Sequence, residues 1–147
     1  MRILGLDPGG TTGAAWIQWD GTTPPQPEML EGYAQVPYAE MPQWFDRQLK
    51  TCCPDLVAIE RFFISPKTIT YTRQPEALYC IGGIEFMCAL HEIPTRQRSA
   101  SSAKNAWDNE RLVGWKVKGK HAKDALRHAL LATHERGVYI PSQTPDP

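Results

Sequence analysis

The order of apolar and polar positions along the chain predicts strands at its beginning. Residues 2–7 form a short apolar run that ends at a Pro-Gly-Gly turn, residues 13–19 form a second run, and residues 29–36 form a third beyond a proline-rich segment. Short apolar runs separated by turn residues are typical of β-hairpins. We therefore expect a three-stranded antiparallel meander.

Helical and strand patterns alternate in the rest of the chain. Apolar residues recur at helical spacing from Ala39 to Leu49, and the apolar run 56–59 indicates a fully buried strand. The later segments predict, in order, an apolar helix over 77–93, a strand over 93–97, turns over 99–120 and a last helix over 121–137, ended by Gly137. The resulting order βββαβαβα indicates an α/β fold, with parallel strands added to the meander and helices flanking the sheet.

Length and composition narrow the class of protein. The 147 residues match the size of one compact domain, residues 1–147. No apolar run reaches the roughly 18 residues that a membrane span needs, so we expect a protein of the cytoplasm. No CxxC pair or zinc-type Cys/His spacing is present, and free thiols are expected at Cys52, Cys53, Cys80 and Cys88.

The net charge is zero, but the charged residues are unevenly distributed. Residues 1–60 carry 3 basic and 8 acidic side chains, whereas residues 61–147 carry 13 basic and 8 acidic side chains. A basic region of this kind meets the phosphates of nucleic acids, although ordinary solvated helix faces produce the same pattern. Charge alone leaves both interpretations open.

Three acidic residues stand at positions that favour chemistry over core packing. Asp7 ends the first strand, Glu60 follows the buried run 56–59, and Asp124 lies in the first turns of the last helix. If the two strands are neighbours, Asp7 and Glu60 meet at one edge of the sheet. Carboxylates brought together repel one another and persist where a hard cation neutralises them. We therefore expect two Mg²⁺ ions, with Mn²⁺ as a substitute, and hydrolysis of a phosphodiester.

Two neighbouring features each admit two interpretations. His121 shares a helix face with Asp124, where its imidazole would ligate a metal, position the attacking water or carry a proton. An exposed helix N-terminus, which favours an acid anyway, is the alternative. The glycines from Gly9 to Gly13 suit either phosphate contact or plain turn geometry.

Several stretches resemble the RuvC family of Holliday junction resolvases. LGLDPGGTTGAA is similar to the family's first strand and turn, VAIERFF to its fourth strand, HAKDAL to its acidic helix motif and ALYCIGGIEFMCALHEIP to its dimer helix. Together they cover most of the chain in the family's order, and the small size resembles the phage-encoded branch. The resemblance implies an RNase H-like fold, a homodimer, a divalent metal and paired nicks at a four-way DNA junction.

The resemblance also implies roles for single residues. Asp7, Glu60 and Asp124 would be metal ligands. His121 would fill a place that is a carboxylate in some relatives and a histidine in others, and Lys104 resembles a lysine that meets the scissile-strand phosphate. The segment from Lys104 to His121 departs from the family pattern, because it is short and ends in a basic stretch instead of a lysine-bearing helix.

Aromatic and basic residues near Glu60 and in the second part of the chain are candidates for DNA contact. Phe62 or Phe63 would stack on opened bases, which contributes roughly 1–3 kcal/mol per base. We expect one of these rings in the core and the other facing DNA. Candidates for backbone contacts are Arg61, Lys67, Arg73, Arg96, Arg98, Lys104, Lys116, Lys118 and Lys120.

Three alternative interpretations share parts of these patterns. DPGGTTG also resembles the phosphate loop of sugar kinases and actin, but those proteins need two such domains and this chain has the length of one. A non-catalytic junction-binding dimer would be marked by a missing carboxylate, and all three are present. An endonuclease that cuts flaps or forks stays open, because selectivity depends on dimer geometry.

Overall fold

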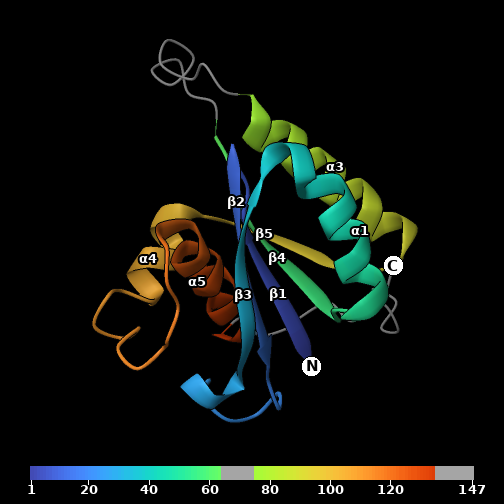
Figure 1. Cartoon of the computed structure of the whole chain (residues 1–147). Coiled ribbons are helices and arrows are strands. Elements are labelled where there is room, and N and C mark those ends of the chain that lie inside the picture. The colour runs from blue at the N-terminus through green and yellow to red at the C-terminus, as the bar shows by residue number, and fades with distance from the viewer. Residues whose placement is uncertain (64–74, 135–147) are drawn as a thin grey trace, which may run out of the picture.

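A five-stranded mixed sheet forms the middle of the molecule (Figure 1). The structure is a computed structural model that describes residues 1–63 and 75–134. The strands are β1 (Arg2–Asp7), β2 (Thr11–Gln18), β3 (Leu30–Pro37), β4 (Leu56–Arg61) and β5 (Thr95–Ser99). β1, β2 and β3 form an antiparallel meander, and β4 and β5 add to β1 as parallel strands in the order β3-β2-β1-β4-β5. The predicted mixed sheet is confirmed, as is the predicted neighbourhood of the first strand and the run 56–59.

Helices cover both faces of this sheet, which Figure 1 shows nearly edge-on. The α-helices of the described ranges are α1 (Met41–Thr51), α3 (Glu76–Leu90), α4 (Ala100–Ala106) and α5 (Lys120–His134). α1 and α3 lie on one face, and α4 and α5 lie on the other. Short 3₁₀ turns, η1 (Pro27–Met29) and η2 (Tyr38–Glu40), flank β3. Of the helices described, none combines the length and the apolarity needed to cross a membrane.

α4 corrects the prediction that residues 99–120 form turns throughout. Its N-cap is Ser99, whose side-chain oxygen accepts a hydrogen bond from the backbone N–H of Ser102 at 3.2 Å. The polar sequence concealed this helix, because only a weak apolar periodicity marks it and Ala103 supplies its buried side. Lys104 therefore lies on a helix, and the basic stretch 115–119 that precedes α5 is not helical. The predicted helix end at Gly137 lies outside the described residues.

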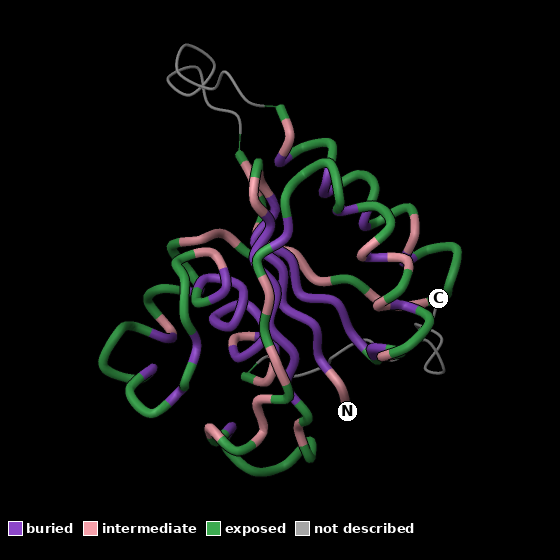
Figure 2. The backbone as a smooth tube through the Cα atoms, in the orientation of Figure 1, coloured by how far each residue is buried: buried purple, intermediate pink, exposed green. Residues whose placement is uncertain are grey.

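Two apolar cores, one on each face of the sheet, fix the direction in which each strand residue points. Figure 2 shows the central strands buried over most of their length. Ile3 and Ala58 belong to the core beneath α5, while their chain neighbours pack toward α1 and α3. Side chains alternate between the two faces of a strand, so Asp7 and Glu60 project on the same side as Ile3 and Ala58. Both acids therefore face α5.

Two glycines allow α5 to lie directly on the strands. A Cβ atom at Gly5 would stand 2.0 Å from the carbonyl oxygen of Ala125, and one at Gly13 would stand 1.9 Å from the carbonyl oxygen of His121. No side chain fits at such separations, so glycine is required for close approach of strand and helix backbones. For Gly13, this contact explains the residue in addition to the turn that precedes it.

α3 is apolar on its outer side as well as on its buried side. Tyr79, Phe86 and Leu90 are 63%, 66% and 68% exposed. A Cβ atom at Gly82 or Gly83 would meet nothing within 4 Å, so no close contact within the described residues requires glycine at these positions. α3 thus presents an uncovered apolar face, a feature typical of an association surface.

As predicted, the cysteines at positions 52, 53, 80 and 88 are free thiols.

Candidate active site

Asp7, Glu60 and Asp124 gather on the α5 side of the sheet, at the carboxyl ends of two neighbouring strands. The parallel register of β1 and β4 pairs Leu6 with Ile59, and the residues that follow this pair are Asp7 and Glu60. Asp124 lies near the start of α5. We call these three residues the carboxylate cluster.

The environment of Asp7 shows that the other two carboxylates act on it. Burial is the main cause that raises the pKa of Asp7 from 3.8 to about 6, and the negative charge of Glu60 adds to it. The hydrogen bond and the charge of His121 oppose this rise, while Asp124 adds a smaller upward effect. A negative charge in the carboxylate cluster therefore costs free energy unless a cation neutralises it.

His121 contacts Asp7 and not Asp124. Its Nδ1 lies 2.8 Å from Oδ2 of Asp7, and the side chain is 42% exposed. The imidazole thus stands at the edge of the cluster, in contact both with a carboxylate and with solvent. Its role as metal ligand, water-positioning group or proton carrier stays a prediction.

Asp124 is held by a cation from its own helix. Nη1 of Arg127 donates to its Oδ1 at 2.6 Å, and the Nζ of Lys104 lies 3.9 Å from its Oδ2. Asp124 is only 6% exposed, which argues against the alternative of a solvent-facing acid at a helix N-terminus. The Lys104 side chain is half exposed, so this longer ion pair adds little stability.

Glu60 has a partner on α5 that sequence reasoning missed. Nε2 of His128 lies 3.2 Å from Oε2 of Glu60, and the His128 side chain is 2% exposed. The signal in the sequence was the polar pair Arg127 and His128 within an otherwise apolar stretch, DALRHALLA. His128 also stands four residues after Asp124, which places it on the same helix face.

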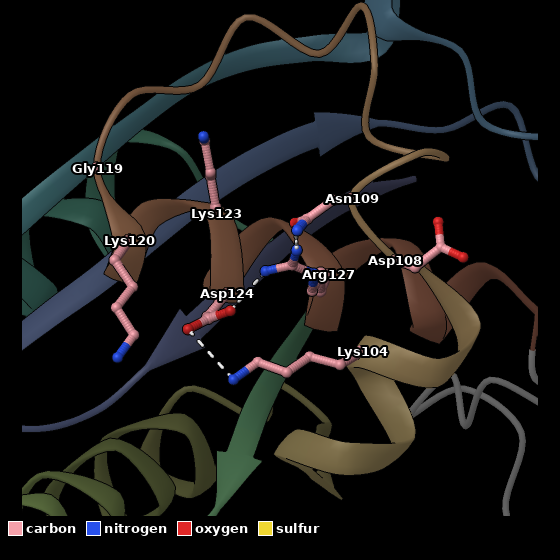
Figure 3. A pocket seen from close by; sticks show the side chains of 8 residues that line it. All are labelled: Lys104, Asp108, Asn109, Gly119, Lys120, Lys123, Asp124 and Arg127. Carbon is pink, nitrogen blue, oxygen red and sulfur yellow. Dashed lines mark hydrogen bonds and ion pairs between the residues drawn. The ribbon is translucent and has the colours of Figure 1, made fainter.

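A pocket opens beside Asp124 and is lined by basic residues (Figure 3). Its volume is about 490 Å³, and it lies between α4, the loop that follows it and the first turns of α5. Lys104, Lys120 and Lys123 line it together with Asp124 and Arg127. Lys123 was not among the predicted residues, although it belongs to the HAKDAL motif. The pocket therefore places positively charged side chains next to Asp124, one of the three residues of the carboxylate cluster.

The described side chains do not surround a single point in the way that metal ligands do. In residues 1–63 and 75–134, no three His, Cys, Asp or Glu side chains are placed to hold one ion. The carboxylate oxygens of the cluster instead form hydrogen bonds or ion pairs with side chains of α5 or α4. The donor set still fits a hard divalent cation, because oxygen ligands are what Mg²⁺ prefers and because burial, together with the charge of Glu60, makes a negative charge on Asp7 costly.

The two phenylalanines after Glu60 differ in burial. Phe62 is partly buried and packs against the core on the α1 and α3 side, whereas Phe63 is 56% exposed. The guanidinium of Arg61 lies 4.5 Å from the centre of the Phe63 ring. One ring packs against the core and the other is exposed, in line with the expectation, and contact of Phe63 with DNA stays a prediction. Lys67 and Arg73 lie outside the described residues.

The other predicted DNA-binding residues lie on two segments. Lys116 and Lys118 are exposed, and they alternate with Trp115 and Val117, which are buried in the core beneath α5. This alternation explains how a loop packs against the protein while presenting its lysines outward. Arg96 and Arg98 belong to β5, and the parallel register of β4 and β5 pairs Arg96 with Ala58 and Arg98 with Glu60.

Similarity to known proteins is detected at the level of structure. No protein-family model matches the chain, and a comparison with curated proteins found no match. RuvC of Thermus thermophilus in complex with Holliday junction substrate gives a TM-score of 0.68 at 20% identity, over 91% of this chain and 92% of that chain. The fowlpox virus Holliday junction resolvase gives 0.56 at 14% identity, over 91% and 98%. The yeast mitochondrial Holliday junction resolvase gives 0.54 at 12% identity, over 89% and 75%.

These structures share the mixed sheet and the helices on both of its faces. The likeness covers 89–91% of this chain in the three comparisons. The chain therefore has the RNase H-like fold of RuvC-type Holliday junction resolvases.

Proposed function

We propose that the protein is a divalent-metal-dependent endonuclease that resolves four-way DNA junctions by paired nicks. The observation that carries this proposal is the carboxylate cluster, formed by two strand ends and α5, with a basic pocket at its border. Solved structures with this fold include a resolvase with Holliday junction substrate bound, which supports branched DNA as the substrate.

Asp7, Glu60 and Asp124 would hold the metal, with His121 as a fourth group at the edge. Two Mg²⁺ ions, replaceable by Mn²⁺, would supply charge stabilisation for the attacking and leaving oxygens of a phosphodiester. His121 contacts Oδ2 of Asp7 and His128 contacts Oε2 of Glu60, so Oδ1 and Oε1 lie outside these two contacts. These oxygens are the ones available to a cation.

The protein's own groups perform the remaining tasks. Lys104, Lys120 and Lys123 line the pocket beside Asp124 and would bind backbone phosphates there. His121, which is in contact with Asp7 and with solvent, would hold a proton next to the cluster. Phe63 would stack on an opened base, because its ring is exposed at the end of β4.

A homodimer through α3 completes the proposal. The exposed rings of Tyr79 and Phe86 and the open backbone at Gly82 and Gly83 form a surface on which a second copy of α3 can lie close. Two active sites related by a two-fold axis would address the two symmetry-related strands of a four-way junction. We further propose that residues 1–147 act as one domain and that the enzyme works in the cytoplasm, that of a bacterial host if the chain is encoded by a phage.

The test is cleavage of end-labelled four-way junction, 5′-flap and linear duplex DNA with Mg²⁺ or Mn²⁺, with Asp7→Asn as the inactive control. Symmetric paired nicks confined to the junction are expected. Preferential cutting of flaps or forks would replace the assigned substrate while keeping a metal-dependent nuclease. Junction binding without any cleavage under either metal would contradict the nuclease and support a non-catalytic junction-binding protein.

A further inference from the structure

Each member of the carboxylate cluster has a partner on α5. His121 contacts Asp7, Arg127 contacts Asp124, and His128 contacts Glu60. His121 is partly exposed, so it can take part in chemistry itself. Arg127 and His128 are buried and adjacent in the chain, and their contacts require a different explanation.

Arg127 is fixed at three points and not only by its ion pair with Asp124. Its Nε donates to the carbonyl oxygen of Trp107 at 2.8 Å, and its Nη2 donates to Oδ1 of Asn109 at 2.6 Å. The third donor, Nη1, holds Oδ1 of Asp124 at 2.6 Å. A guanidinium anchored to a loop in this way cannot follow the carboxylate, so it determines where the carboxylate lies. Figure 3 shows Arg127 between Asp124 and Asn109.

His128 acts on Glu60 from inside the core. Its side chain is 2% exposed, and its ring nitrogen Nε2 lies 3.2 Å from Oε2 of Glu60, whose own side chain is 23% exposed. When Nε2 carries its proton, it donates to the carboxylate and holds Oε2. This contact uses one oxygen of Glu60, and the other, Oε1, takes no part in it.

We propose that Arg127 and His128 are positioning residues, which orient Asp124 and Glu60 for a divalent cation without touching the cation themselves. This inference rests on the proposed metal-dependent function. Polar groups that hold metal-ligating carboxylates set the geometry of the ligands and hence the affinity for the metal. A buried arginine and histidine cost desolvation free energy that apolar residues would avoid, so fold stability alone does not account for them.

The experiment measures Mn²⁺ binding by electron paramagnetic resonance without DNA, for the full chain and for Arg127→Met and His128→Leu. Both variants should bind Mn²⁺ roughly 10- to 100-fold more weakly. Cleavage should fall at low Mn²⁺ and recover in part at high Mn²⁺, whereas junction affinity in EDTA should stay unchanged. Arg111→Met is the matched control, because it removes an exposed arginine from the loop between α4 and α5; it should match the parent chain.

Two milder variants keep the test decisive if a buried substitution prevents folding. Asn109→Ala removes one anchor of Arg127 at an exposed position and should weaken Mn²⁺ binding. His128→Gln places an amide donor near the former Nε2 and should restore much of what His128→Leu loses. Circular dichroism establishes which variants are folded.

The outcomes separate this inference from the proposed function. If the parent chain binds no Mn²⁺ and cuts no DNA, the proposed function fails. If the parent chain binds Mn²⁺ and cuts junctions while the folded variants bind Mn²⁺ equally well, the positioning roles alone are overturned. Tighter binding by Arg127→Met would also overturn the inference, because Arg127 would then be a competitor of the metal.

Discussion

The backbone of His121 lies directly over Gly13, so closely that a Cβ atom at position 13 would fall 1.9 Å from the carbonyl oxygen of His121. This contact joins β2 to the first turn of α5, next to the carboxylate cluster. Because Gly13 has no side chain, α5 can lie close to the sheet. This short distance determines the positions of His121 and Asp124.

Gly13→Ala should lower the free energy of unfolding by about 1–3 kcal/mol or more, because the methyl group forces strand and helix apart. It should also reduce cleavage, since His121 and Asp124 move with α5. Urea titration measures the first effect and a junction cleavage assay the second. Gly32→Ala on β3 is the control, because its Cβ would meet the ring of Trp16 at an ordinary 3.7 Å. Equal stability of the two variants would refute the close-contact explanation.

Asp7→Asn should stabilise the metal-free protein at neutral pH. The pKa of Asp7 in the folded protein is raised to about 6 from 3.8, so the folded state binds this proton more tightly than the unfolded state does. Its contribution to stability is complete below about pH 4 and is lost as the pH rises through about 6. The gain for Asn at pH 8 in EDTA is at most about 3 kcal/mol, since one pKa unit corresponds to 1.36 kcal/mol.

Thermal melts of both proteins at pH 4 and pH 8 in EDTA check this prediction. The difference between the variant and the parent chain should be small at pH 4 and large at pH 8. A variant less stable than the parent chain at pH 8 would show that Asp7 is not electrostatically strained in the folded protein.

Glu60→Gln and Asp124→Asn should each abolish cleavage while leaving junction binding in EDTA largely intact, because both remove a proposed metal ligand. His121→Ala should slow turnover less severely, since its side chain is 42% exposed at the edge of the cluster. Single-turnover cleavage and gel-shift binding measure the two properties. Cleavage near the parental rate by either carboxylate variant would remove that residue from the metal site.

Phe86→Glu should convert the proposed dimer to a monomer, because it places a charge in the uncovered apolar face of α3. Folding should be retained, since Phe86 is 66% exposed. Val113→Glu is the matched control, with a residue that is 78% exposed and far along the chain from α3. Sedimentation velocity distinguishes the two states. Unchanged sedimentation of Phe86→Glu, or a parent chain that is already monomeric, would contradict the dimer.

The sequence predicted the sheet well because its signals were local. The apolar runs of β1, β2 and β4 and the turns between them can be recognised in the order of residues along the chain. The positions of Asp7 and Glu60 at the carboxyl ends of their strands follow from the pairing of β1 with β4. α4 was missed because it is short and polar, and its clearest mark is the Ser99 cap.

Contacts between distant segments were beyond sequence reasoning. Arg127 and His128 would pass for ordinary helix residues, and only the folded chain shows that Glu60, 68 positions earlier, is the partner of His128. Gly13 was assigned to turn or phosphate contact because the helix that requires it lies more than a hundred residues away. A contact between residues that are far apart in the chain leaves no local pattern in the sequence.

The place of α5 in the chain has a consequence for how the protein is made. α5 follows every strand that the structure describes, and it brings Asp124 together with the partners of all three carboxylates. A chain still on the ribosome displays Asp7 and Glu60 long before Asp124, Arg127 and His128 have emerged. The proposed nuclease is therefore inactive during synthesis until its last described helix has emerged and docked on the sheet.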